Sequence, residues 1–243
     1  MLGESHEIVS KEAIKKIIPE LKTLIENRAG IFESGLYVPD KFMMWDRDPS
    51  EPVEKGPMPK RLVHRYFVDD LEADRRGELV AQIFMYTDGI LAFILDETQL
   101  EDGKDYVAEH IVLFFGFLCH FLMDLCTPVH IGHNLHQMLL KKGGKRYHQK
   151  FERSLLRYQR KLSNWDEIDL PPCNLSEDWL IEVAEATYKD YEKLPKMFDS
   201  DIEKNSKAIC KSVSARALAV VVSWVNKMVE SDRVQEKLVT LIM

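Results

Sequence analysis

Apolar residues recur along most of the chain at the three- and four-residue spacing of amphipathic helices. The pattern predicts a first helix, N-capped by Ser5, that runs to about residue 27 and is bent or split by Pro19. A second helix is expected from 74 to about 95, and a strongly apolar one from about 105 to 125. Further helices are expected over 148–162, 177–194, 199–230 and 231–243. The segment 215–225 is apolar on almost all sides, so we expect its helix at the centre of the core.

Proline and glycine mark the expected breaks between these helices. Gly30 and Gly35 predict a break, and residues 41–63, with four prolines, predict a long loop. Gly143 and Gly144 precede the helix at 148–162, and residues 164–176 form a second expected loop. Because no repeat, low-complexity segment or linker interrupts the pattern, the sequence predicts a single compact all-α domain over residues 1–243.

Composition narrows the classes of protein to which the chain can belong. With 243 residues, 45% of them hydrophobic, it can bury a large core, and its 11 glycines and 10 prolines are few, as in helical proteins. A formal net charge of -7 argues against a stable nucleic-acid complex. The four cysteines show neither C-x-x-C spacing nor the density of a disulfide scaffold, and Cys119 and Cys126 are expected to pack as small hydrophobes.

The same composition bears on the location of the protein. No apolar run is taken to be long enough for a transmembrane segment, and the N-terminus lacks the hydrophobic region of a signal peptide. We therefore expect a cytoplasmic protein if Met1 is the native start, and a secreted one if the chain is trimmed.

The polar residues that stand out in this pattern are His120, Asp124 and His130. His120 and Asp124 are four residues apart, so a helix places both side chains on one face. Pro128 kinks or ends that helix, which lets His130 turn back toward the same space. Because polar groups are costly in an apolar segment unless they are satisfied, two imidazoles and a carboxylate here indicate a zinc site.

A second pair, His148 and Glu152, has the same helical spacing and suggests more than one metal ion. The simpler alternative, for His120 and Asp124 alone, is a hydrogen-bonded pair in the core. The added His130 and the second pair favour the metal site over that alternative.

Five short blocks of sequence occur in a recognisable order. They are Ser5-His6, residues 33–40 (ESGLYVPD), His64 followed by Tyr66, His120-x-x-x-Asp124 with His130, and His148-x-x-x-Glu152. Together they resemble the zinc-dependent phospholipase C family, which shares its all-helical fold with fungal single-strand nucleases. The blocks span residues 1–152, and the apolar helix near 207–228 is similar to the family's last core helix.

The resemblance implies a cluster of two or three zinc ions held between the helices. The ligands of the first ion would be Asp40, His64, His120 and Asp124. Those of the second would be His130, His148 and Glu152, with Asp40 bridging the two ions. The third would take His6, Asp124 and the backbone amine and carbonyl of the first residue, here Met1. Asp46 and Asp48 are alternatives to Asp40, and manganese or iron are alternatives to zinc.

The activity that the resemblance implies is phospholipase C-like hydrolysis of a phosphodiester, with Asp40 as the catalytic base beside the attacking water. Activity is expected to fall below about pH 6, because the ligands must be deprotonated to bind metal. One alternative is a single-strand nuclease or nucleotidase of the same superfamily. Another is a catalytically idle helical interaction module that its metals stabilise.

The expected substrate positions depart from both branches of the family. Lys41 and Arg61 stand where the resembling phospholipases have an aromatic pair that binds choline. Arg65, followed by Tyr66, stands where the fungal nucleases stack a base on an aromatic ring. These four residues are the candidates for substrate binding, and the cations suggest an anionic head group or a second phosphate. Simple solvation of the 41–63 loop is the alternative for Lys41 and Arg61.

The expected partner is a phosphodiester, either a phospholipid head group with peripheral membrane contact or a nucleotide. His133 and His136 are expected to line the pocket rather than bind metal.

Overall fold

A computed structural model of the chain describes residues 3–42, 66, 68, 78–95, 103–132, 144–194 and 206–242, with the backbone alone for residues 3, 40–42 and 144–149. These ranges form nine α-helices and contain no strand, which confirms the all-α prediction. The helices are α1 (Gly3–Ile14), α2 (Pro19–Glu26), α3 (Ala29–Phe42), α4 (Leu79–Leu95), α5 (Lys104–Leu125), α7 (Gly144–Gln159), α8 (Glu177–Tyr191), α11 (Lys207–Met228) and α12 (Asp232–Ile242). Two short 3-10 turns, η3 (Pro128–His130) and η4 (Trp165–Glu167), lie between them.

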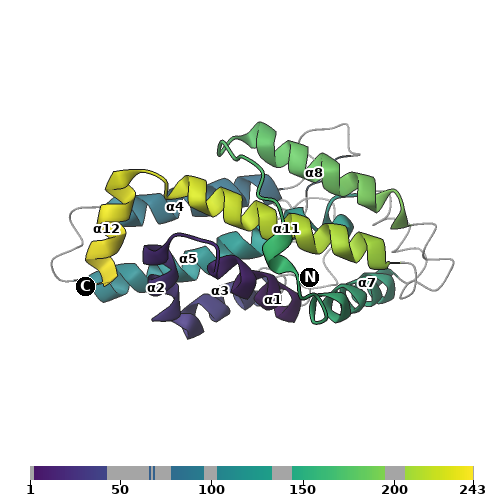
Figure 1. Cartoon of the computed structure of the whole chain (residues 1–243), viewed down its shortest axis with the longest axis horizontal. Coiled ribbons are helices and arrows are strands. Elements are labelled where there is room, and N and C mark those ends of the chain that lie inside the picture. The colour runs from purple at the N-terminus through teal and green to yellow at the C-terminus, as the bar shows by residue number, and fades with distance from the viewer. Residues whose placement is uncertain are drawn as a thin grey trace, which may run out of the picture.

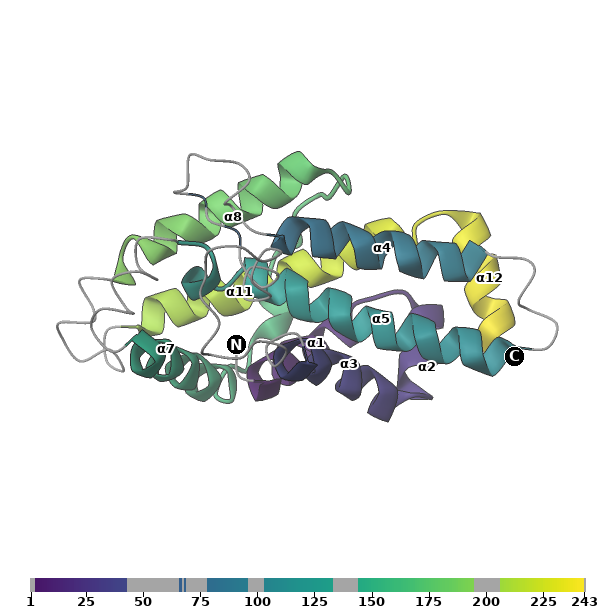
Figure 2. The ribbon, with the colours of Figure 1, turned by 180° about the vertical axis from the view of Figure 1, so that it is seen from behind.

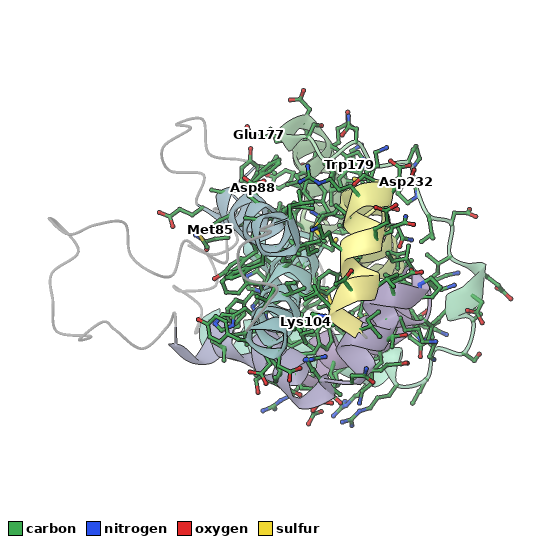
Figure 3. The ribbon with its side chains drawn as sticks, turned by 90° about the vertical axis from the view of Figure 1, so that its left-hand side faces the viewer. Met85, Asp88, Lys104, Glu177, Trp179 and Asp232 are labelled. Atoms are coloured by element: carbon green, nitrogen blue, oxygen red, sulfur yellow. The ribbon has the colours of Figure 1, made fainter. Side chains whose placement is uncertain are left out.

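Helix α11 runs along the middle of the molecule, with α8 on one side and α1 and α7 on the other (Figure 1). Seen from behind, α4 and α5 lie side by side, and α12 crosses their ends (Figure 2). Figure 3 looks onto this end, where α5 begins at Lys104 and α12 begins at Asp232. The helices therefore surround α5 and α11, the two longest elements of the described chain.

One hydrophobic cluster joins these helices, from Val9 in α1 to Leu241 in α12. Every residue from Phe115 in α5 to Gly132 beyond η3 is buried. In α11, Trp224 is fully buried and its indole Nε1 donates to Thr87 Oγ1 at 2.9 Å, so its polar atom is satisfied. Truncating a tryptophan of this kind to alanine costs about 3–5 kcal/mol. The prediction that the helix within 199–230 lies at the centre of the core is confirmed.

The first predicted helix is split at Pro19, as the sequence suggested. Helix α1 ends at Ile14, and α2 begins at Pro19, the first-turn position where the missing N–H of proline costs nothing. The prediction of Ser5 as an N-cap was wrong. Ser5 lies inside α1, fully buried, and its hydroxyl donates to Gln159 Oε1 of α7 at 2.5 Å.

The predicted break between Gly30 and Gly35 was also wrong, because α3 runs through both glycines from Ala29 to Phe42. Gly35 allows α3 to cross close to α5 and does not form a turn. A Cβ added there would lie 2.4 Å from Leu113 O and 2.9 Å from the Cα of Gly116, so the backbones of α3 and α5 touch at this level. Glycine is the residue that allows such an approach.

Two helices, α5 and α11, are long and apolar enough to cross a membrane, judged by length and composition, with mean hydropathies of 1.7 and 1.5. The expectation that no apolar run reaches that length was therefore wrong. Their apolar stretches are 72% and 67% buried within the protein, which is typical of core helices. The absence of a transmembrane segment stays a prediction.

Candidate metal centre

Asp124 is the second-to-last residue of α5 and is fully buried. His120 precedes it by four residues, and its Nε2 atom is 3.3 Å from Asp124 Oδ2. The other ring nitrogen of His120, Nδ1, lies 2.9 Å from the carbonyl oxygen of Leu36 in α3. The spacing in the sequence therefore places both side chains on one face of α5, as predicted.

His130 reaches the same carboxylate from beyond the helix end. Helix α5 stops at Leu125, and Pro128 then begins the 3-10 turn η3. The turn is closed by the backbone N–H of His130, which donates to Thr127 O at 2.9 Å. The result is a distance of 3.6 Å between His130 Nε2 and Asp124 Oδ1, so the predicted return of His130 is confirmed.

The third imidazole, His6, comes from the other end of the described chain. It lies in α1, which packs against α3, α5, α7 and α11. Its Nε2 atom is 3.3 Å from Asp124 Oδ1, and its ring centroid is 4.2 Å from that of His120. Two polar contacts hold α1 in place on either side of His6, from Ser5 to Gln159 at 2.5 Å and from Tyr37 to Glu7 at 2.8 Å.

Burial governs the protonation of this group. Burial, followed by the neighbouring His120 ring, lowers the pKa of His6 from 6.5 to about 4, so its imidazole is neutral at pH 7. Burial by itself would raise the pKa of Asp124, yet the His130 and His120 rings hold that pKa well below its usual value. A neutral imidazole beside an ionised carboxylate is the protonation state that metal binding requires.

The donor atoms fit a metal ion of the zinc class. One donor atom each from His6, His120 and Asp124 lies within 4.8 Å of the others. In a tetrahedral zinc site with bonds of about 2.0–2.1 Å, ligand atoms lie roughly 3.3 Å apart, which is close to the His–Asp distances in this protein. His6 Nδ1 is buried and has no hydrogen-bond partner among the described residues, and the buried Nε2 atom faces Asp124 Oδ1 at 3.3 Å. Unsatisfied buried nitrogens of this kind are costly unless a cation binds them.

The two oxygens of Asp124 face different rings. Oδ1 lies toward His6 and His130, whereas Oδ2 lies toward His120. A carboxylate in this position can bridge two ions, one on each oxygen. The sequence resemblance assigns Asp124 to two of the three ions, the first and the third.

For most of the other residues predicted to bind metal or substrate, the structure describes only the backbone or does not describe the residue. Glu152 lies in α7 and is 5% exposed. Asp40 and Lys41 in α3 and His148 in α7 have only their backbone described. Tyr66 is buried, and its backbone N–H donates to His130 O at 3.1 Å. The other residues named from the sequence lie outside the described part of the chain: Met1, Asp46, Asp48, Arg61, His64, Arg65, His133 and His136.

Several groups around the centre were not found from the sequence. The carbonyl of Leu36 carries no sequence signal, because every residue has a carbonyl. Gly116, isolated within an apolar helix, was a usable signal, since such a glycine often has a packing reason. Cys119 and Cys126 are buried and free, and burial raises the pKa of Cys126 to about 12, so both pack as small hydrophobes, as predicted.

Comparison with known proteins supports the fold. The structure is similar to that of alpha-toxin from Clostridium perfringens, isolated from the avian strain SWCP, with a TM-score of 0.54 and 12% sequence identity. The match covers 92% of this chain and 62% of that chain, so this protein spans less than two thirds of its length. At this identity the likeness shows the fold alone. No protein-family model matches the sequence, and none of the curated proteins searched matches it.

Proposed function

We propose that this protein is a zinc-dependent phosphoesterase, a hydrolase of the phospholipase C type. The observation that carries the proposal is the convergence of three histidines on Asp124 in a buried site. The resemblance of the five sequence blocks to the zinc-dependent phospholipase C family supplies the reaction class. The fold likeness to alpha-toxin is compatible with this family but does not by itself supply the activity.

Each of the proposed ligands would have a separate role in the reaction. Bound zinc supplies Lewis-acid activation of a water molecule and of the phosphate oxygens. Asp124 would be a ligand of two ions, to which His6 and His120 would present neutral nitrogens, and His130 would present one to the ion that it shares with Asp40. His64, His148, Glu152 and the backbone of Met1 are proposed to complete the ligand set that the resemblance implies.

Asp40 is proposed to be both a bridging ligand and the catalytic base. Its backbone lies one turn after Leu36 in α3, and the Leu36 carbonyl contacts the His120 ring. In the reaction, water forms a bond to phosphorus, its proton passes to the Asp40 carboxylate, and the ester P–O bond to the leaving group breaks. The leaving oxygen then takes a proton, which balances the step.

Substrate selection is proposed to involve Lys41, Arg61, Arg65 and Tyr66. The cations among them favour an anionic head group over choline, because two positive charges repel a quaternary ammonium ion. The proposed partner is therefore a phosphodiester with an additional negative group, on a phospholipid surface.

The first experiment is metal analysis of untagged protein by mass spectrometry, for the wild type and for Asp124→Asn. A matched control is Asp190→Asn, because Asp190 is also a buried carboxylate but is paired with Arg216. We expect two or three zinc ions in the wild type and in the control, and fewer in Asp124→Asn. Hydrolysis of a chromogenic phosphodiester should follow the metal content and return when zinc is added back to chelated wild type.

Two results would contradict the proposal. If folded wild-type protein binds no metal from zinc-containing buffer, the proposed metal centre does not exist and the proposal is wrong. A zinc-loaded protein that hydrolyses neither chromogenic phosphodiesters nor phospholipids leaves the interaction module as the better description. Preference for single-stranded oligonucleotides over phospholipid vesicles would assign the nuclease branch instead.

A further inference from the structure

Helices α3 and α5 touch through their backbones immediately beside the candidate metal centre. A Cβ added at Gly116 would lie 2.6 Å from Phe32 O and 2.7 Å from the Cα of Gly35. A Cβ added at Gly35 would lie 2.4 Å from Leu113 O. All of these neighbours are backbone atoms, which cannot rotate away as a side chain can. Any side chain at either glycine would therefore force the two helices apart.

This contact lies one turn from a proposed ligand. His120 follows Gly116 by four residues on α5, and Leu36 follows Gly35 directly on α3. The Nδ1 atom of His120 is 2.9 Å from the Leu36 carbonyl oxygen. A carbonyl oxygen only accepts, so Nδ1 carries the proton and donates it. The remaining nitrogen, Nε2, faces Asp124 Oδ2 at 3.3 Å.

The close approach is local to this level of the two helices. Gly30 lies in the same helix as Gly35, and a Cβ added there would meet no atom within 4 Å. Gly89, in α4, would meet only the ring of Phe114 at 3.3 Å. The backbone contact at Gly35 and Gly116 therefore does not extend to Gly30, and it lies next to the level at which the Leu36 carbonyl contacts His120.

We propose that Gly35 and Gly116 are positioning residues for the metal centre. They set the separation of α3 and α5 at which the Leu36 carbonyl fixes the tautomer and orientation of His120, with Nε2 directed at the metal. The inference rests on the metal centre of the proposed function, but not on the identity of its substrate. Outer-shell partners of metal-bound histidines commonly act in this way.

The test compares the zinc affinity of Gly35→Ala and Gly116→Ala with that of wild type and of Gly30→Ala, by competition with a chromogenic chelator. We expect affinity about 10- to 100-fold weaker in the first two variants, the range for the loss of an outer-shell contact. Gly30→Ala should bind zinc as the wild type does, with an apo melting temperature that is equal or higher, because alanine favours helix. Circular dichroism of each apo variant measures its folding separately.

Nitrogen NMR of the histidine rings in zinc-loaded wild type tests the inference without any variant. His120 should show its proton on Nδ1 and metal on Nε2. A proton on Nε2 of His120 overturns the inference, and so does a folded Gly35→Ala or Gly116→Ala protein with wild-type zinc affinity. Normal zinc affinity and the expected tautomer, in a protein without phosphodiester hydrolysis, would overturn the proposed function while supporting this inference.

Discussion

Two buried aspartates in this protein, Asp190 and Asp124, have different kinds of positively charged or ionisable neighbours. Asp190 on α8 is 5% exposed and is neutralised by fixed cations: Arg216 Nη2 donates to it at 2.9 Å and Lys193 Nζ at 3.1 Å. The Ser212 hydroxyl donates to the same carboxylate at 2.7 Å. Asp124 on α5 is fully buried and faces three imidazoles at 3.3–3.6 Å.

The difference lies in the permanence of the positive charge. A guanidinium remains protonated at any pH a protein meets, whereas an imidazole changes charge near neutral pH. His6 is neutral at pH 7, because its pKa is lowered to about 4. The pairing of Asp190 with Arg216 is therefore a permanent structural ion pair that joins α8 to α11. The group around Asp124 instead has the composition of a site that an added cation completes.

The largest expected effect is a difference in metal-dependent stability between the two aspartates. At free zinc about 1,000 times the dissociation constant, binding stabilises the folded state by about 4 kcal/mol. For a chain of this length that corresponds to a rise in Tm of about 8–16 °C. Differential scanning calorimetry should show this rise in the wild type and in Asp190→Asn, and its loss in Asp124→Asn. An equal rise in Asp124→Asn would remove the distinction between the two carboxylates.

The next effect is a pH dependence that belongs to the Asp124 group. Because the pKa of His6 is lowered to about 4 in the folded state, the unfolded chain binds more protons between pH 4 and 6.5. The unfolding free energy of apo protein should therefore fall as pH drops through that window, by up to about 3 kcal/mol from His6.

Urea unfolding of wild type and His6→Gln at pH 7, 5.5 and 4.5 measures this dependence. The slope should be smaller in the variant, and His6 should contribute no slope between pH 7 and 8. Equal slopes in the two proteins below pH 6.5 would mean that His6 is not held neutral by burial.

A smaller effect is expected on the structural side of the comparison. Asp190→Asn weakens charge-assisted hydrogen bonds to Arg216 and Ser212, at a cost of about 2 kcal/mol. The corresponding fall in Tm is about 4–8 °C. Burial alone would raise the pKa of Asp190, but hydrogen bonds from Ser212 and Arg216 lower it. The stability that the carboxylate contributes is thus present above its unfolded pKa and lost in more acid solution.

Thermal melts of wild type and Asp190→Asn at pH 7 and pH 3 test both statements. The gap in Tm should narrow at pH 3, while zinc content at pH 7 stays that of the wild type. Loss of zinc from Asp190→Asn would show that the ion pair supports the metal centre as well as the fold.

The smallest effect is expected where an ion pair is exposed. Arg160 Nη2 lies 2.7 Å from Glu4 Oε2, and both side chains are 59% exposed. Arg160→Ala should change stability by less than about 0.5 kcal/mol, because solvent screens such pairs. Its Tm should lie within about 2 °C of the wild type. A larger fall would show that this exposed contact also anchors α1 beside His6.

The sequence by itself determined the local features of this protein. Helix periodicity located α5 and α11, and the i,i+4 spacing placed His120 and Asp124 on one face. Pro128 ended that helix and turned His130 back, because a missing N–H and a fixed φ act within one turn. Each of these features depends on residues close together in the chain, which is why pattern alone could predict them.

The tertiary structure decided which distant residues contact these local features. The sequence pattern predicts a chain break at Gly35, but Gly35 lies inside α3 and allows the close contact of α3 with Gly116 of α5, which no pattern within α3 reveals. His6 was assigned to the centre through family resemblance, and only the packing of α1 against α5 brings it to 3.3 Å from Asp124. Which helices cross, and at what depth, depends on long-range packing of the whole core, and that packing decides whether a buried carboxylate meets a guanidinium or a group of imidazoles.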